Sequence, residues 1–360
     1  MNNFPEGNAV IYCQGAFNTT NGKTAHGLVR FTRRYHVLSV IDSRYSEKDA
    51  GEVLDGQPKN VPIVASIEEA LRLAVSSGQN PTHMVIGLAP DGGRLSLEAR
   101  EDVKKAIESG LHIDIGLHDF LTEDSEMMAL AEAHGVTIRD IRKPLPRSQL
   151  HFFSGKIEEV SCLKIAVLGT DSAVGKRTTA WLIIKALEGL GITAEMVGTG
   201  QTSWLQGAKY GTVFDSLVND FVSGEIEHAV WSAWKNEAPD VIIIEGQGSL
   251  MNPAYPGGYE ILAAARPDII VLQHAPARKE YDGFPGYPIH PLSKQISAIE
   301  YISSKPVVAV TINHEDLEAE EIPHICTAIQ NITGLPAYDV LTGRGAANLA
   351  EKVLTFLKKQ

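Results

Sequence analysis

One stretch of this chain constrains its fold more than any other: residues 164–187 read KIAVLGTDSAVGKRTTAWLIIKAL. An apolar run ends at Gly169, a loop follows, and Gly175-Lys176 leads into a helical pattern. This arrangement is typical of a P-loop, in which backbone N–H groups, a helix N-terminus and a lysine converge on phosphate oxygens. The alternative interpretation is a glycine-rich turn without a ligand. We predict a cofactor-binding loop of Gly169, Thr170, Asp171, Ser172, Ala173, Val174, Gly175, Lys176, Arg177, Thr178 and Thr179.

Two positions of this loop depart from the usual P-loop pattern. Thr170 occupies the position of the first glycine, and Arg177 occupies the position after the lysine, where a Ser or Thr hydroxyl ordinarily binds Mg²⁺. Arginine cannot ligate Mg²⁺, but it can pair with a phosphate. We therefore expect phosphate binding without a metal requirement, and we expect Mg-dependent phosphoryl transfer to be disfavoured. The loop resembles that of dethiobiotin synthetase and its relatives, which also read GTD followed by VGK.

The rest of the chain alternates short β-rich runs with helical patterns, which is typical of an α/β fold. The strands expected in the first half are residues 9–13, 36–41, 61–65, 83–87 and 112–116. Between them, Ser66 followed by Glu69 predicts a capped helix start, and Ser96 with Gly110 predicts the two ends of another helix. We predict an open, mostly parallel sheet of the Rossmann-like kind in this half.

Residues 141–161 interrupt this alternation, because Pro144 and Pro146 exclude a continuous helix and no period is sustained. The alternation restarts directly afterwards. The predicted domains are a Rossmann-like domain, residues 1–155, and a P-loop NTPase-like α/β domain, residues 156–360.

Composition excludes several classes of function. A net charge of −12 over 360 residues, with 7% aromatic residues, argues against a nucleic-acid partner. No apolar run approaches the ~20 residues of a membrane span, and the N-terminal residues lack a signal-peptide pattern. Cys13, Cys162 and Cys326 are too few and too widely spaced for a disulfide framework or a paired-cysteine metal site. We expect a cytoplasmic homo-oligomer that acts on small molecules and needs no metal.

Two carboxylates are candidates for catalysis. Glu245 follows the apolar run 241–244, and ligands of parallel sheets bind beyond the carboxyl ends of the strands. It could hold a metal, orient a water or accept a proton from an amine, or it could only cap the next turn. Asp220 lies in a helix-like stretch, residues 218–230, where a surface carboxylate is the alternative. We predict Glu245 and Asp220 as the catalytic residues.

Two further segments have the composition of ligand-binding loops. Residues 197–207 combine glycines, hydroxyls and a tryptophan, and residues 273–292 form a long aromatic segment without a period. Arg278 and Lys279 are candidates for binding anionic groups, although a solvated surface loop would look similar. The predicted substrate-binding residues are Gln201, Gln247, Gly248, Ser249, Arg278, Lys279 and Tyr281.

The whole chain resembles domain-of-unknown-function family 1611. The matching segments are residues 23–30, 40–56, 87–93, 116–121, 138–144, 169–179, 198–207, 218–225, 245–250 and 273–292. The resemblance implies a Rossmann-like domain joined to a P-loop domain related to dethiobiotin synthetase. Because the family includes D-glutamate N-acetyltransferases, it also implies transfer of acetyl from acetyl-CoA to the amino group of an acidic D-amino acid, D-glutamate first, in D-amino acid catabolism.

The chemistry of the residues fits this implication better than it fits a kinase. Coenzyme A carries a pyrophosphate and a 3′-phosphate, which suit Lys176 and Arg177. The amine must lose a proton, which a carboxylate can accept, and backbone amides of a glycine-rich loop can stabilise the oxyanion. Lys23 and Arg30 are further cations for a dicarboxylate. Two alternatives stay open: an ATP-dependent ligase or kinase of the dethiobiotin synthetase type, and a nucleotide- or CoA-sensing regulator without catalysis.

Overall fold

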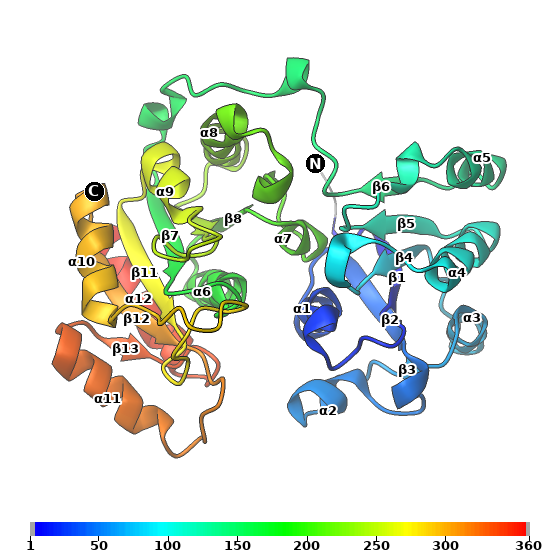
Figure 1. Ribbon diagram of the computed structural model, residues 1–360, viewed down its shortest axis with the longest axis horizontal. Helices are drawn as coiled ribbons and strands as arrows, with labels where there is room; N and C mark the ends of the chain where they lie inside the picture. The colour runs from blue at the N-terminus through cyan, green and yellow to red at the C-terminus, as the bar shows by residue number, and fades with distance from the viewer. Residues whose placement is uncertain (1–3, 358–360) are drawn as a thin grey trace. The chain divides into compact units, whose positions relative to one another are not determined.

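The computed structural model describes residues 4–357, without the side chain of Asp91. The chain divides into two compact units (Figure 1): the first contains the chain up to Pro144 together with Gln201–Gly207, and the second contains Leu145–Gly200 and the chain from Ala208 onward. Each unit is an α/β structure built on a parallel sheet, which confirms the predicted fold class. The predicted boundary at 155/156 assigns residues 145–155 to the first domain and residues 201–207 to the second. The structure places 145–155 in the second unit and 201–207 in the first.

The first unit has a six-stranded sheet in the order β3-β2-β1-β4-β5-β6. Its strands are β1 (Gly7–Tyr12), β2 (Tyr35–Ile41), β3 (Ile63–Val64), β4 (His83–Ile86), β5 (His112–Ile115) and β6 (Ile138–Asp140). Its helices are α1 (Lys23–Arg30), α2 (Ala50–Asp55), α3 (Ile67–Ser76), α4 (Leu97–Glu108), α5 (Ser125–Ala133) and α7 (Gln201–Leu205). All five strands expected from the sequence are present. Strand β6 was not predicted because its three residues are too few to show an apolar period.

The predicted helix starts in this unit are confirmed. The Ser66 hydroxyl accepts a hydrogen bond from Glu69 N at 3.3 Å, and Glu69 Oε2 accepts one from Ala65 N at 2.7 Å, so the reciprocal bond of the capping box is made one residue early. The Ser96 hydroxyl accepts a hydrogen bond from Ala99 N at 3.1 Å. These side chains satisfy amide donors that an isolated helix would leave unpaired.

Helix α7 lies far along the sequence but is packed within the first unit. The Arg34 guanidinium, 1% exposed, lies 3.6 Å from the centre of the Trp204 ring, and its Nε donates to Trp204 O at 2.7 Å. Gln206 Nε2 donates to Gly27 O at 2.8 Å. From Gln201 onward, the segment predicted to be a ligand-binding loop is therefore packed within this unit.

The second unit has a seven-stranded sheet in the order β13-β12-β11-β7-β10-β8-β9. Its strands are β7 (Leu163–Gly169), β8 (Ala194–Gly198), β9 (Tyr210–Gly211), β10 (Val241–Glu245), β11 (Ile269–His274), β12 (Val307–Ile312) and β13 (Ala337–Tyr338). Its helices are α6 (Lys176–Gly189), α8 (Asn219–Glu237), α9 (Gly258–Glu260), α10 (Leu292–Ser303), α11 (Ile322–Thr333) and α12 (Gly345–Leu357). The central strands are buried on both faces, which explains their continuous Val and Ile runs.

The junction after Pro144 is held on the surface of α8. Glu225 Oε1 accepts hydrogen bonds from His151 N at 2.7 Å and from His151 Nδ1 at 2.8 Å, and Glu227 Oε2 accepts one from Ser154 N at 2.7 Å. A Cβ at Gly224 would lie 1.9 Å from His151 O, so only glycine allows this approach. Over residues 4–357, none of the helices combines the length and apolar character that a membrane-spanning helix requires.

Candidate functional site: a phosphate-binding loop at the sheet edge

The sheet order of the second unit places the loop after β7 between the ends of two other strands. Strand β7 pairs with β11 on one side, where Gln273 is opposite Gly169, and with β10 on the other, where Glu245 is opposite Val167. Because all three strands are parallel, their carboxyl ends meet at one edge, where ligands of α/β sheets bind. By this register Glu245 lies deeper in the sheet than the loop itself.

The backbone of the loop depends on glycine at two positions. Gly175, the residue before α6, has φ 102°, a left-handed conformation that side chains disfavour. A Cβ at Gly169 would lie 2.9 Å from Lys176 Cδ, so the absence of a side chain leaves room for the lysine. The loop therefore turns into the helix and directs Lys176 back over the end of β7.

Lys176 is held by backbone carbonyl groups. Its Nζ donates to Asp171 O at 2.6 Å and to Gly248 O at 2.9 Å, and the side chain is 7% exposed. Burial lowers the pKa of Lys176 to about 8, and the nearby carboxylates of Glu245 and Asp171 only partly oppose this effect. A bound anion would supply the negative charge that this buried ammonium lacks.

Asp171, predicted to bind a cofactor, connects three segments of the protein. Its carboxylate is 0% exposed. Oδ1 accepts hydrogen bonds from Ser172 N at 2.7 Å and Asn252 Nδ2 at 2.8 Å, and Oδ2 accepts from Arg278 Nη1 and Asp282 N, both at 2.8 Å. The P-loop, the loop after β10 and the long loop after β11 are therefore held together by this one side chain.

The two cations predicted to bind substrate, Arg278 and Lys279, have different surroundings in the structure. Arg278 donates from Nη1 to Ser172 O at 2.7 Å in addition to Asp171, and it forms an ion pair with Glu315. Burial opposes its charge, but the hydrogen bonds to Glu315 and Asp171 outweigh burial and raise the pKa of Arg278. Lys279, the next residue, is exposed. Of the pair, Lys279 has the accessible charge, while Arg278 holds the P-loop.

Polar side chains at the end of β11 were missed by sequence reasoning. Thr179 Oγ1 and Thr311 Oγ1 each donate to Gln273 Oε1 at 2.5 Å, so the Thr179 hydroxyl joins α6 to the sheet. Thr170 Oγ1 shares a hydrogen bond of 3.0 Å with His274 Nδ1, and burial lowers the pKa of His274 to about 4. Gln273 and His274 begin the segment 273–292 that was predicted to be a ligand-binding loop, but nothing in the sequence distinguished these two side chains within it.

The two predicted catalytic carboxylates differ in burial. Glu245 is 6% exposed at the end of β10, and its Oε2 accepts a hydrogen bond from Thr199 N at 2.9 Å. Asp220 is exposed in the first turn of α8. Of these two carboxylates, Glu245 is therefore the one that is shielded from water, as a reacting group would need to be.

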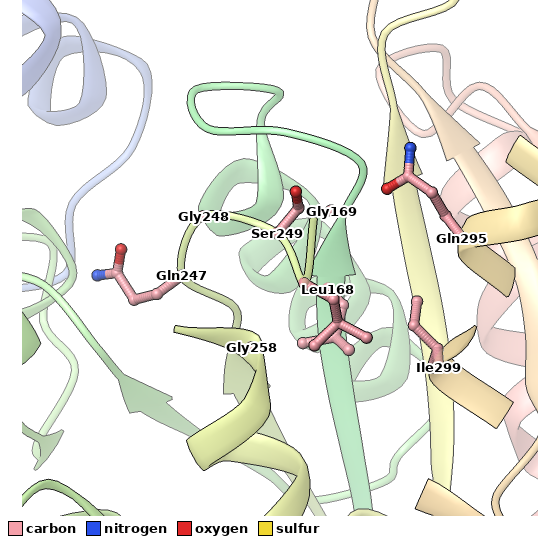
Figure 2. A pocket seen from close by; sticks show the side chains of 9 residues that line it. Leu168, Gly169, Gln247, Gly248, Ser249, Gly258, Gln295 and Ile299 are labelled. Carbon is pink, nitrogen blue, oxygen red and sulfur yellow. The ribbon is translucent and has the colours of Figure 1, made fainter. Parts of the chain in front are cut away.

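A small cavity lies beside the P-loop. It has a volume of about 10 Å³, close to what one water needs, and is lined by Leu168, Gly169, Gln247, Gly248, Ser249, Leu250, Gly258, Gln295 and Ile299. Figure 2 shows Ser249 between Gln247 on one side and Gln295 on the other. Among residues 4–357, the buried Ser249 hydroxyl has no hydrogen-bond partner, whereas Gln247 Nε2 donates to Thr199 O at 2.7 Å.

The other predicted substrate residues lie in different surroundings. Tyr281, in the long loop after β11, is 4% exposed, and burial raises the pKa of its hydroxyl. Gln201 begins α7 in the first unit, where a Cβ at Gly116 would lie 2.6 Å from Gln201 Cγ. Within the second unit, the Asp171 contacts and the cavity thus bring together Gly248, Ser249, Arg278 and the P-loop.

Both parts of the chain match models of one family. The model described as a domain of unknown function (DUF1611_C), a P-loop domain, matches residues 151–350, and the DUF1611_N Rossmann-like domain matches residues 43–144. The chain belongs to the DUF1611 family. The resemblance inferred from the motifs is confirmed, as is the P-loop character of the loop at 169–179.

Two named proteins and one crystal structure are similar to this DUF1611 chain over most of its length. A protein of Tritonibacter scottomollicae named D-glutamate N-acetyltransferase is 31% identical over 263 residues, 71% of this chain and 76% of the relative. A protein of the same name from Pseudoalteromonas sp is 30% identical over 282 residues, 77% of this chain and 81% of the relative. The crystal structure of a DUF1611 family protein from Anabaena variabilis is 30% identical with a TM-score of 0.88, and the match covers 97% of this chain and 99% of that one.

Proposed function

We propose that this protein is an N-acetyltransferase that moves the acetyl group of acetyl-CoA to the amino group of an acidic D-amino acid, with D-glutamate as the first candidate. The observation that carries the proposal is a P-loop with its lysine in place and an arginine at the metal-hydroxyl position, in a chain about 30% identical to proteins named D-glutamate N-acetyltransferase. The three cysteines are free, as a cytoplasmic enzyme of D-amino acid catabolism would have them.

The P-loop suits the acyl donor. The pyrophosphate of coenzyme A needs convergent N–H donors and a cation, and the loop backbone with Lys176 offers both. Arg177 occupies the first turn of α6, where it can pair with a second phosphate. The hydroxyl of Thr179 is already bonded to Gln273, so Thr179 does not take over the role of a metal ligand. Donor binding therefore needs no divalent cation.

Glu245 is the residue we assign as proton acceptor. In the reaction the acceptor ammonium gives one proton to the Glu245 carboxylate, and the amine nitrogen attacks the thioester carbonyl carbon. The C–S bond breaks as the amide forms, and the second proton of the nitrogen goes to the leaving thiolate of coenzyme A. A buried carboxylate beside the phosphate cradle suits this role better than the exposed Asp220, which stays a second candidate.

Two groups suit the other requirements of acyl transfer. The Ser249 hydroxyl, buried and without a protein partner in the described chain, can donate to the thioester oxygen as negative charge develops on it. Lys279 provides an accessible cation for a substrate carboxylate on the loop that Arg278 holds at the P-loop. Both assignments are part of the proposal.

The alternative is an ATP-dependent ligase or kinase of the dethiobiotin synthetase type. The observation in its favour is the P-loop domain itself, with the carboxylate of Glu245 at the end of the neighbouring strand. Against it stands Arg177, which cannot supply the hydroxyl ligand of Mg²⁺. A sensor that binds the same ligands without catalysis is the third possibility.

Calorimetric titration separates these functions. We expect acetyl-CoA to bind equally well with EDTA or Mg²⁺, and ATP to gain nothing from Mg²⁺. Tight binding of Mg-ATP without binding of acetyl-CoA would overturn the acetyltransferase. Arg177→Thr is the diagnostic variant, because it restores the hydroxyl: it should lose acetyl-CoA affinity and make ATP binding depend on Mg²⁺.

An acceptor screen then tests catalysis. Release of the coenzyme A thiol is followed with D-glutamate, L-glutamate and D-aspartate, and we expect the fastest release with D-glutamate. Binding of acetyl-CoA without thiol release in the presence of any acidic amino acid would support the sensor and contradict the enzyme.

A further inference from the structure

Three aromatic rings come together on the loops beside the P-loop. Tyr255 belongs to the loop after β10, whereas Phe284 and Tyr287 belong to the long loop after β11. The centre of the Phe284 ring lies 6.4 Å from that of the Tyr255 ring and 6.4 Å from that of the Tyr287 ring, with edge-to-face geometry in both pairs. Tyr255 and Tyr287 are each 57% exposed. We call Tyr255, Phe284 and Tyr287 the aromatic patch.

Short contacts connect the aromatic patch to the phosphate cradle. Lys176 Nζ donates to Gly248 O at 2.9 Å, and a Cβ at Gly248 would lie 1.6 Å from Tyr255 O. Ser249 N donates to the same Tyr255 oxygen at 3.1 Å. The backbone of Tyr255 therefore lies directly against the residue that holds the P-loop lysine. In Figure 1 both loops are drawn in yellow to gold, following β10 and β11.

The loops that carry the patch are held in one conformation by many hydrogen bonds. Asn252 donates to Asp171, and its Oδ1 accepts from Ala254 N and Tyr255 N, both at 2.9 Å. In the second loop, Phe284 N donates to Tyr281 O at 2.9 Å and Tyr287 N donates to Phe284 O at 3.1 Å. A fixed backbone with exposed rings loses little entropy when a flat ligand stacks on it.

The carboxylate of Asp171 is fully hydrogen-bonded where these loops meet the P-loop. Its ion pair with Arg278 and its bond from Asp282 N tie the second loop to the phosphate cradle. An anionic ligand in the P-loop therefore meets a carboxylate whose oxygens are already hydrogen-bonded, and it has exposed aromatic rings nearby. A ligand that carries phosphates and a flat heteroaromatic ring matches both the P-loop and the aromatic patch. Every nucleobase has a π-face, so any of them can stack on an aromatic side chain.

We propose that the aromatic patch is the subsite for the adenine ring of a ligand whose phosphates lie in the P-loop. This inference rests on the proposed function for the identity of that ligand, acetyl-CoA. Adenosine diphosphate carries the same ring and a pyrophosphate, so the two sources of adenine are separate arms of the test.

The experiment compares Tyr255→Ala and Tyr287→Ala with Tyr255→Phe and with a matched control, Tyr301→Ala. Tyr301 is 89% exposed on α10, outside the patch. Affinities for acetyl-CoA, ADP and inorganic pyrophosphate are measured by calorimetry or competition. We expect each alanine variant of the patch to weaken binding of acetyl-CoA and ADP about tenfold. Pyrophosphate affinity should stay within about twofold, because it has no ring to stack.

The outcomes separate this inference from the proposed function. If acetyl-CoA does not bind but ADP binding falls only in the patch variants, the adenine subsite stands and the acetyltransferase fails. Equal losses for ADP and pyrophosphate, or no loss in either alanine variant, would overturn the subsite. Unchanged affinities with an altered oligomeric state would assign the rings to a contact between copies of the chain and would also overturn it. Tyr255→Phe should keep wild-type affinity, since it retains the ring.

Discussion

Lys176 and Gly248 meet through a hydrogen bond of 2.9 Å from the ammonium to the backbone carbonyl oxygen, with the lysine 7% exposed. Because burial lowers the pKa of Lys176 from 10.5 to about 8, the charged form is disfavoured in the folded protein. This cost to stability is fully present below about pH 8 and disappears as the pH rises through 10.5. A phosphate beside Nζ reduces the cost, because its negative charge compensates that of the buried ammonium.

Ligand binding should consequently take up a proton at alkaline pH. We expect the affinity for a P-loop ligand to be flat near pH 7 and to fall above pH 8, with a slope approaching about tenfold per pH unit. Calorimetry in buffers of different ionisation enthalpy counts the protons. Lys176→Arg keeps the charge at all these pH values and should flatten the profile. A wild-type affinity that stays constant to pH 10 would contradict the shifted lysine.

Removing the charge of Asp171 should destabilise the second unit. Asp171→Asn leaves Arg278 with Glu315 as its remaining carboxylate partner and removes the buried half of this ion-pair network, and breaking a buried ion pair costs about 3 kcal/mol. The free energy of unfolding in urea measures this loss. Lys279→Ala is the control from the same loop, because Lys279 is exposed and its removal should change stability by less than about 0.5 kcal/mol. Equal effects of the two variants would contradict the structural role of Asp171.

Gly248→Ala should disturb the phosphate cradle without unfolding the protein. Gly248 has φ 49°, and its Cβ would lie 1.6 Å from Tyr255 O, so the loop must move away from Lys176. We expect the affinity for acetyl-CoA to fall at least about tenfold. Gly283→Ala is matched in backbone conformation, with φ 78°, but has no atom within 4 Å of its Cβ position, so it should keep its affinity.

Gly224→Ala should release the junction from α8. The added methyl would lie 1.9 Å from His151 O, which would break the bonds of Glu225 to His151. Limited proteolysis should then cut residues 145–156 at least about tenfold faster than in the wild type, because an undocked segment is open to a protease nearly all the time. Ser223→Ala, one residue earlier on the same helix, should leave the cleavage rate unchanged.

Much of the fold was predictable because strand and helix signals are local. Apolar runs such as 241–244 and caps such as Ser66 are formed by neighbouring residues, so the sequence contains the whole reason for them. The strand–loop–helix context of Lys176 identified the P-loop for the same reason. Short elements such as β6 contain too few residues to show a period.

The partners of each site residue were not predictable, because they depend on contacts between distant segments. Arg278 looked like a substrate cation, and nothing in its neighbourhood of the sequence shows that Asp171 and Glu315 are its partners. Gly224 and Glu225 formed a family motif that could be taken as part of a site, whereas the structure shows them binding the junction at His151. A sequence motif can therefore hold a loop in place as well as bind a ligand.

Helix α7 has a consequence for how such a protein can be assembled from parts. The first unit is complete only with residues 201–207, which are encoded after the P-loop. A gene fragment that ends near Pro144 would encode a unit whose Arg34 lacks Trp204 and whose Gly27 lacks Gln206. The two units cannot be exchanged between genes as separate modules, so the phosphate-binding half and the Rossmann-like half are expected to be inherited together.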